Sequence, residues 1–225
     1  MIKSESIIET INLKKYYRRG SEIVKALDGI DFSMNSGEMV AIVGPSGSGK
    51  TTFMNMIGCL DVPTEGSIKI VGQDVANLKE SQLVHVRRKN IGFIFQRFHI
   101  IPTLTVKENI ELPLVFTKDN TVQNAKFDEL LEKLGLKGKE HMQANMISGG
   151  DKQLVSIARA LIYDPKIIIA DEPTGRLEKK ERDMIINLFK ELAKSGLAIV
   201  IATHDLSIAE ESDRVVHLQD GRILQ

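Results

Sequence analysis

Apolar residues fall along this chain in two patterns, short unbroken runs and longer stretches with a helical period. Three runs, at 39–43, 167–171 and 198–203, are apolar almost throughout and have the length of buried strands. Weaker strand signals cover residues 67–71 and 91–95. The sequence therefore predicts at least five strands from its apolar runs alone.

The first 43 residues are predicted to form short strands without helices. An apolar segment begins at 7–11, residues 16–20 have the composition of a turn, and residues 23–32 alternate between apolar and polar. A tight turn at 35–38, Asn-Ser-Gly-Glu, then leads into the buried strand at 39–43. We expect these strands to form an antiparallel β-subdomain at the N-terminus.

Apolar positions three or four residues apart predict helices in the rest of the chain. A polar helical stretch is expected between the strands at 67–71 and 91–95, and a short helix after residue 203. The other predicted helices cover residues 50–60, 106–115, 126–134, 152–163 and 179–195.

The order of these elements predicts an α/β protein with one domain, residues 1–225. Helices gather in the middle of the chain, whereas strands and helices alternate after it. We expect a core with its β-subdomain from residues 1–96 and 161–225, and a helical subdomain inserted at about 97–160.

Composition excludes several classes of protein. Thirty basic and 30 acidic residues leave no net charge, so no basic footprint for nucleic acid is visible over the whole chain. The single cysteine, Cys59, excludes an internal disulfide and a cysteine metal cluster, as is typical of a reducing cytosol. The N-terminal residues lack the layout of a signal peptide, and no apolar run approaches the length of a membrane span.

The stretch from Gly44 to Thr52 fits the phosphate-binding pattern G-x-x-x-x-G-K-[ST]. Glycines let successive backbone N–H groups turn towards an anion, and the following helix adds its positive dipole end. Lys50 supplies a charge for the β- and γ-phosphates, and the Thr51 hydroxyl can bind Mg²⁺. The alternative is a glycine-rich turn with an unrelated lysine. The predicted nucleoside triphosphate site consists of Gly44, Pro45, Ser46, Gly47, Ser48, Gly49, Lys50, Thr51 and Thr52.

Two acidic residues follow the predicted strand at 167–171. Asp171 ends that strand, where a carboxylate beside the phosphate loop can hold Mg²⁺ through its water shell. Glu172 points elsewhere because strand residues alternate, and it can orient or deprotonate a water molecule. The alternative is a solvated acidic turn before Pro173.

The order of these motifs resembles the nucleotide-binding subunit of an ABC transporter across essentially the whole chain. The runs at 57–61, 63–66 and 91–98 are similar in particular to the lipoprotein-release and macrolide-exporter ATPases, which work with permeases of the cell-division type. The resemblance implies a P-loop NTPase core of the ABC ATPase kind that binds ATP and Mg²⁺. It also implies ATP hydrolysis in a head-to-tail dimer with two nucleotides between the subunits.

The resemblance also implies roles for residues outside the two motifs above. Tyr17 matches the aromatic residue that stacks on adenine, and Gln96 matches the glutamine that contacts Mg²⁺ and the attacking water and senses the permease. Glu172 matches the catalytic base and His204 the switch histidine. Magnesium would then be held by Thr51, Gln96 and, through water, Asp171. Contacts across the dimer are implied for Ser148, Gly149, Gly150 and Glu178.

Each of these residues also has a simpler interpretation from the sequence alone. Tyr17 stands next to Tyr16, and either ring could serve ordinary packing. A glutamine after a strand is usually polar surface, and so is a histidine in that place. Ser148 before two glycines could be a helix N-cap with a flexible turn, although such a helix start also makes an anion site.

The chain departs from the family pattern at several places in its second half. Leu154 replaces an arginine, Asp151 replaces glutamine or glutamate, Glu178 replaces aspartate, and Ala144 stands where proline is common. An arginine offers a charge and five donors that leucine lacks. We hypothesise that ATP binding is intact while dimer closure or turnover is slower than is usual in the family.

Three functions are compatible with the sequence. The first is an ATPase that drives or gates a membrane permease of the cell-division type, held at the cytoplasmic face of the membrane through that permease. The second is a nucleotide-dependent regulatory or assembly module with weak hydrolysis. The third is a soluble ABC protein of DNA repair or translation, but such proteins are longer, and we expect no nucleic-acid partner. Residues 96–105 and the helical insertion are expected to receive the permease.

Overall fold

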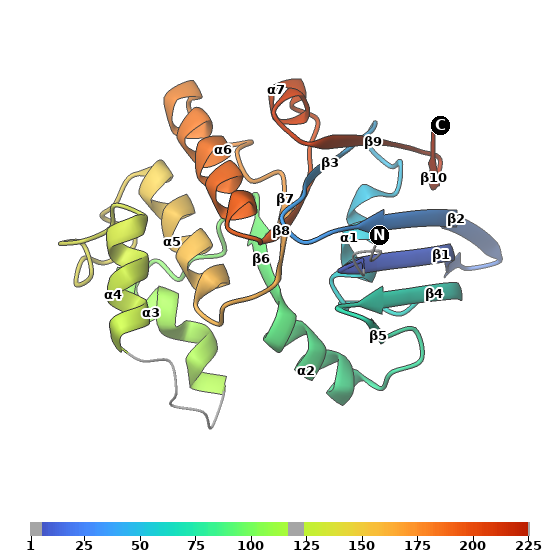
Figure 1. Cartoon of the computed structure of the whole chain (residues 1–225), viewed down its shortest axis with the longest axis horizontal. Coiled ribbons are helices and arrows are strands. Elements are labelled where there is room, and N and C mark those ends of the chain that lie inside the picture. The colour runs from blue at the N-terminus through green and yellow to red at the C-terminus, as the bar shows by residue number, and fades with distance from the viewer. Residues whose placement is uncertain (1–5, 117–123, 225) are drawn as a thin grey trace, which may run out of the picture.

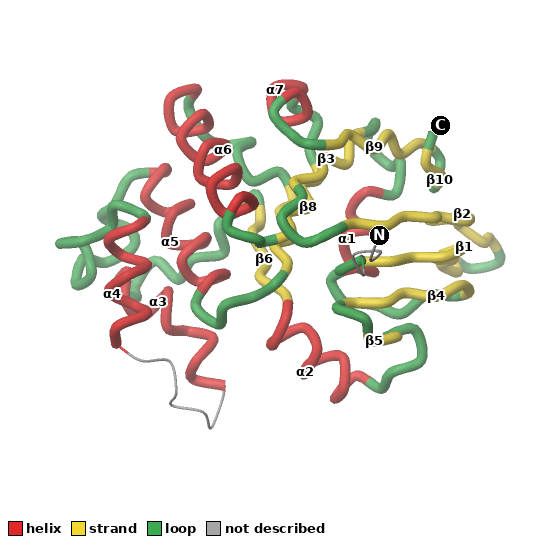
Figure 2. The backbone as a smooth tube through the Cα atoms, in the orientation of Figure 1, coloured by secondary structure: helices red, strands yellow, loops and turns green. Residues whose placement is uncertain are grey.

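The computed structural model describes residues 6–116 and 124–224 and contains two β-sheets (Figures 1 and 2). The smaller sheet is antiparallel, with strand order β2-β1-β4-β5. It lies on the right of Figure 1, at the side away from the helices α3 to α5. Its strands are β1 (Ile8–Arg19), β2 (Glu22–Met34), β4 (Glu65–Ile70) and β5 (Gln73–Asp74).

The larger sheet has the order β10-β9-β3-β8-β7-β6, and its strands run parallel except for β10. Parallel strands end at the same edge of a sheet, so the loops that follow them lie together. Asp220 and Gly221 both have positive φ and form the turn between β9 and β10, which closes the sheet with a hairpin. The strands are β3 (Met39–Val43), β6 (Ile91–Phe95), β7 (Ile167–Asp171), β8 (Ala198–Ala202), β9 (Arg214–Gln219) and β10 (Arg222–Ile223).

Alternate residues of the parallel sheet enter two different cores, which is why its strands are apolar without a break. On one face, Val40 and Ile42 pack with helix α1 (Lys50–Ile57) and helix α2 (Glu80–Asn90). This core continues into the antiparallel sheet, where the rings of Phe32 and Phe53 meet edge to face with centroids 5.3 Å apart. Helix α1 therefore joins the two sheets.

The other face of the parallel sheet is covered by the helices of the second half of the chain. Helices α3 to α5 lie together on the left of Figure 1, and α6 and α7 lie beside the parallel sheet. The elements are α3 (Val106–Glu111), the 3₁₀-helix η1 (Leu112–Phe116), α4 (Asn124–Lys133), α5 (Gly149–Leu161), α6 (Lys179–Lys194) and α7 (Leu206–Glu210).

Three predicted elements differ from the structure. Residues 16–19 belong to β1, since Tyr16 pairs with Lys25 and Tyr17 with Val24, and the turn begins only at Gly20. The helix expected at 106–115 changes to a 3₁₀-helix after Glu111, beside a proline that cannot donate a backbone hydrogen bond. Helix α5 begins three residues earlier than expected because the Ser148 hydroxyl accepts a hydrogen bond from Asp151 N at 3.0 Å.

Candidate functional site

The carboxyl edge of the parallel sheet gathers the predicted phosphate loop and the residues expected to act on phosphate. Strand β3 leads into the loop at Gly44, β6 into Gln96 and β7 into Glu172. His204 follows β8, which pairs with both β3 and β7. Together these segments line a cavity of about 790 Å³.

The phosphate loop requires glycine because other backbone lies against it. A Cβ on Gly44 would stand 2.1 Å from the carbonyl oxygen of Leu218. A Cβ on Gly49 would stand 2.5 Å from the carbonyl oxygen of Ala26, and the φ of Gly49 is +106°. A side chain at either position would displace the loop from β9 or from β2.

Lys50 opens helix α1 and turns back over the loop. Its Nζ donates to the carbonyl oxygens of Gly44 and Pro45 at 2.7 and 2.9 Å. The buried hydroxyl of Ser48 has no hydrogen-bond partner among the described residues. The loop therefore places a lysine ammonium, a helix N-terminus and backbone N–H groups at one wall of the cavity, which is the chemistry of a phosphate site.

Asp171 and Glu172 line the same cavity. Burial raises the pKa of the Asp171 carboxyl, the neighbouring Glu172 raises it further, and the Lys50 ammonium lowers it. Two carboxylates and the Thr51 hydroxyl thus line one space, and a half-buried acid with a raised pKa favours a cation beside it. This donor set fits Mg²⁺, which prefers oxygen ligands.

The Glu172 carboxylate is held by the segment after β8. It accepts hydrogen bonds from Thr203 Oγ1 at 3.2 Å and from the backbone N–H of His204 at 3.1 Å. The Nδ1 atom of His204 lies 2.7 Å from the same carboxylate. Glu172 has φ +48°, a conformation that costs a residue with a side chain about 1–3 kcal/mol and is common at functional sites.

Gln96 and Tyr17 occupy different places relative to the cavity. Gln96 is exposed at its wall, and its Nε2 atom packs against Gly175, where a Cβ would stand 2.9 Å away. Tyr17 lies outside the residues that line the cavity, with 39% of its surface exposed. Its hydroxyl donates to Asp61 at 3.1 Å, and Lys15 Nζ lies 5.1 Å from its ring centroid. Tyr17 thus stays a predicted adenine contact.

Ser148, Gly149 and Gly150 form the N-terminus of α5 and do not line the cavity. A Cβ on Gly149 would meet no atom within 4 Å, so the chain faces open space at this residue. The N–H of Gly150 instead donates to the Glu181 carboxylate at 3.0 Å. Glu178 is exposed at the N-cap of α6, also outside the cavity.

The unusual residues of this helix have structural partners within the chain. The Asp151 carboxylate pairs with Lys139 Nζ at 2.7 Å, and Leu154 is 7% exposed in the helical core. The fully buried Gln153 donates from Nε2 to the carbonyl oxygen of Pro173 at 2.6 Å. Helix α5 is therefore tied to the segment that follows Glu172.

Two residues of this region were not found from the sequence, Asn109 and Arg159. Asn109 is fully buried and exchanges hydrogen bonds with the backbone of Ile101, while also donating to Leu104 and Thr105. Arg159 donates to two carbonyl oxygens of the segment after Gln96. The only signal for either was a polar residue on a helix face that is otherwise apolar.

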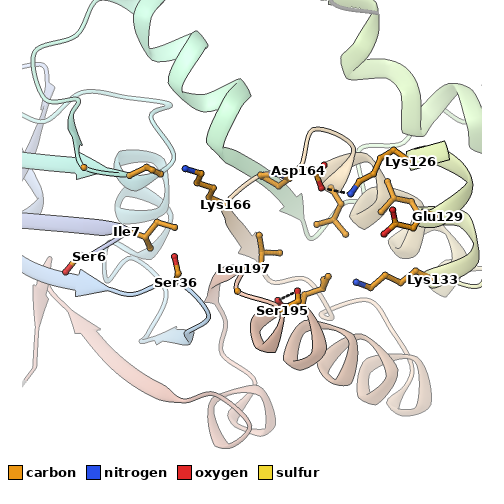
Figure 3. A pocket seen from close by; sticks show the side chains of 17 residues that line it. Ser6, Ile7, Ser36, Lys126, Glu129, Lys133, Asp164, Lys166, Ser195 and Leu197 are labelled. Carbon is orange, nitrogen blue, oxygen red and sulfur yellow. Dashed lines mark hydrogen bonds and ion pairs between the residues drawn. The ribbon is translucent and has the colours of Figure 1, made fainter. Parts of the chain in front are cut away.

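A second cavity, of about 700 Å³, lies at the other end of the parallel sheet (Figure 3). It contains none of the residues predicted to bind nucleotide. Lys126 forms an ion pair with Asp164, and Lys133 lies in the last turn of α4. A basic side chain at a helix C-terminus complements the helix dipole, which explains Lys133, and the ion pair with Asp164 explains Lys126.

Comparisons with known proteins agree with this geometry. Residues 27–175 match the family model described as ABC transporter. The ATP-binding protein YvrO of Bacillus subtilis (strain 168), an uncharacterized ABC transporter protein, is 44% identical over 214 residues, which cover 95% of this chain and 93% of YvrO. The macrolide export ATP-binding/permease protein MacB of Escherichia coli is 44% identical over 223 residues, which cover 98% of this chain but only 34% of MacB.

Solved structures give the same result. The dimeric structure of the bacterial ABC transporter cassette MJ0796 is 41% identical, with a TM-score of 0.86 and 97% of both chains covered. A second MJ0796 structure, 40% identical, is a post-hydrolysis state bound to ADP and Pi. No helix in the described part of this chain has both the length and the apolarity needed to span a bilayer. The chain thus belongs to the ABC transporter ATP-binding proteins and is an ATPase of that family.

Proposed function

We propose that this chain is the ATP-binding and hydrolysing subunit of a membrane complex and drives a partner permease through ATP-dependent, head-to-tail dimerisation. The observation that carries this proposal is the position of Ser148–Gly150. Ser148 and Gly149 of this turn are exposed, and all three residues lie outside the cavity that holds Lys50 and Glu172. The turn can contact a nucleotide in such a cavity only if the cavity belongs to a second chain.

Within one cavity we assign Lys50 to the β- and γ-phosphates and Glu172 to the attacking water. Thr51, Gln96 and Asp171 would hold Mg²⁺, which neutralises charge on the phosphate oxygens. In the structure Glu172 is bonded to His204. A γ-phosphate that attracts the His204 imidazole would free the carboxylate to accept a proton from water.

A groove beside Gln96 supports a permease as the partner. It has a volume of about 450 Å³ and lies between α2, β6, α5 and η1, with Phe93, Leu112 and Phe116 among its lining. Phe116 is 79% exposed. In MacB, whose name includes a permease, the region similar to this chain is about a third of the protein. We assign the groove to a short permease segment with an apolar face, which would hold the chain at the membrane from its cytoplasmic side.

A second candidate, the regulatory module with weak hydrolysis, is favoured by the structure of α5. Asp151 is engaged with Lys139, and Leu154 is part of the core, so neither offers its side chain to a nucleotide in a second chain. Glu172 opposes this candidate because it lines the cavity and would be a suitable base.

The test measures ATP hydrolysis and size together for the wild type, Glu172→Gln and Lys50→Ala. Glutamine keeps the shape of Glu172 but is not a base, so we expect hydrolysis to fall by about 10²–10⁴. The same variant should elute as a dimer with Mg-ATP and as a monomer without it. Lys50→Ala is the control that should neither hydrolyse ATP nor dimerise. A Glu172→Gln protein that stays monomeric with Mg-ATP, or hydrolyses at the wild-type rate, would contradict the proposal.

A further inference from the structure

The segment that follows Gln96 has an unusual backbone. Phe98 and His99 have φ values of +41° and +48°, so two consecutive residues with bulky side chains adopt the left-handed conformation. Non-glycine residues enter this region rarely, and then mostly singly. A segment with this conformation persists only where its surroundings hold it.

Arg159 of α5 stabilises this backbone conformation. Its guanidinium donates to the carbonyl oxygen of His99 at 2.5 Å and to that of Phe98 at 2.7 Å. These are the two residues with positive φ. A guanidinium presents its donors in a rigid fork, so one side chain fixes both peptide groups relative to each other.

The surroundings of Arg159 favour this contact over an ordinary ion pair. Burial lowers the pKa of the guanidinium, and in the described part of the chain no carboxylate lies within ion-pair distance of it. A charge that is partly removed from water and paired only with carbonyl oxygens lowers the stability of the fold. Packing of the helical core therefore does not explain an arginine at this position.

The fold brings α5 close enough for the contact. Gly92 of β6 lies directly under the helix, where a Cβ would stand 2.5 Å from the carbonyl oxygen of Ala160. Arg159 precedes Ala160, and Phe98 and His99 follow the end of β6 by three and four residues. The contact therefore links the helix that begins at Ser148–Gly150 to the segment that begins at Gln96.

We propose that Arg159 is a positioning residue for ATP hydrolysis, which acts by fixing the Phe98–His99 backbone and thereby the side chain of Gln96. This inference rests on the role proposed above for Gln96. Arg159 does not line the nucleotide cavity and touches no substrate. It sets where Gln96 stands relative to Asp171 and Glu172 when nucleotide is bound.

A double-mutant cycle tests the inference on the full chain. The variants are Arg159→Met, Gln96→Ala and the two combined, with Arg159→Lys as the conservative substitution. Arg19→Met, which changes an exposed arginine of β1, is the matched control. For each we measure kcat, KM for ATP, and binding of a fluorescent ATP analogue without Mg²⁺.

We expect Arg159→Met to lower kcat by about 10- to 100-fold, the size of effect that a displacement of about 1 Å produces. KM and Mg²⁺-free binding should stay within about twofold of the wild type. In the Gln96→Ala background the same substitution should cause no further loss. Lysine should restore only part of kcat because a single ammonium lacks the fork.

Losses that multiply in the double variant, an unchanged kcat in Arg159→Met, or an unchanged kcat in Gln96→Ala would each overturn the inference. A failure of the proposed function is seen separately, since it appears in the wild type as an absence of ATP-dependent dimerisation. Hydrogen exchange in the nucleotide-free chain adds a readout that needs no turnover. Amides of residues 98–101 should exchange faster in Arg159→Met than in Arg19→Met, and equal exchange would also overturn the inference.

Discussion

The two adjacent acids, Asp171 and Glu172, show how position along a strand gives similar side chains different chemistry. Asp171 is the last residue of β7 and lines the same cavity as Lys50, whose charge acts on its carboxyl. Glu172 leaves the strand with a positive φ and accepts hydrogen bonds from Thr203 and His204. Glu172 is thus bonded within the chain, whereas the Asp171 carboxyl keeps a raised pKa.

The raised pKa of Asp171 predicts a gain in stability when its charge is removed. A carboxyl whose pKa is higher in the folded than in the unfolded state destabilises the fold where it is ionised, and this penalty disappears as the pH falls through the raised pKa. We therefore expect Asp171→Asn to raise the melting temperature of the nucleotide-free chain at neutral pH. The difference from the wild type should shrink as the pH is lowered, as measured by thermal unfolding over a pH series.

Mg-ATP is the internal control for this prediction. A bound cation would favour the ionised carboxylate. Mg-ATP should therefore raise the melting temperature of the wild type more than that of Asp171→Asn. A variant that is less stable than the wild type at neutral pH without nucleotide would show that the Asp171 charge is already compensated within the fold.

At the scale of the element, helix α5 combines the anion-binding chemistry of a helix N-terminus with an unusual sequence after it. Ser148 caps the helix, Gln153 reaches Pro173 and Arg159 reaches Phe98 and His99. Leu154 and Asp151, which depart from the family pattern, turn to the helical core and to Lys139. The helix is thus fixed within its own chain by contacts on several sides.

The hypothesis of slower turnover gives a prediction for α5 and α6 together. We expect Leu154→Arg combined with Glu178→Asp to raise ATP hydrolysis by up to about tenfold, which corresponds to 1.4 kcal/mol in the barrier. Aspartate is a good N-cap, so the change at the exposed Glu178 should leave α6 stable. The rate is measured at saturating ATP for the two single variants and the double variant.

Leu154 is only 7% exposed, so its substitution needs a stability measurement beside the rate. An arginine at this position must extend its alkyl chain through the core so that its guanidinium reaches solvent. Thermal unfolding of the double variant shows whether the variant is as stable as the wild type or is destabilised. An unchanged or lower rate in a variant that melts like the wild type would refute the hypothesis.

The sequence predicted the elements that depend on local pattern and missed those that depend on distant partners. Apolar runs placed β3, β7 and β8 closely because both faces of these strands are buried. The turn predicted at 16–20 was wrong because pairing with residues 22–25 extends β1 to Arg19. The site follows the same division. The phosphate loop is a contiguous motif and could be predicted from the sequence. Arg159 could not, because it contacts carbonyl groups 60 and 61 residues away.

At the scale of the whole molecule, the predicted nucleotide contacts divide between two surfaces. The phosphate loop precedes α1, whereas Ser148 caps α5, a helix that lies on the left of Figure 1 with α3 and α4. The phosphate loop lines the cavity, whereas Ser148 does not. Under the proposed function, a complete site needs two copies of the chain arranged head to tail, which gives two equivalent sites in a closed dimer.

Cysteine cross-linking tests this arrangement, and the chain suits the method. Its single cysteine, Cys59, is fully buried, and burial raises the pKa of its thiol to about 11, so it should not react. Chains with Ser46→Cys are mixed with chains carrying Ser148→Cys and treated with a short bifunctional maleimide. With Mg-ATP we expect covalent dimers that contain one chain of each kind.

Each variant alone is the control, because in a head-to-tail dimer Ser46 faces Ser148 and not another Ser46. A second control adds Lys50→Ala to both chains, which should abolish the cross-link by removing the phosphate contact. Dimers that form equally well from one variant alone would indicate a head-to-head arrangement. A mixture that gives no covalent dimer with Mg-ATP, while both chains still bind nucleotide, would mean that the two surfaces do not meet and that Ser148–Gly150 serves another contact.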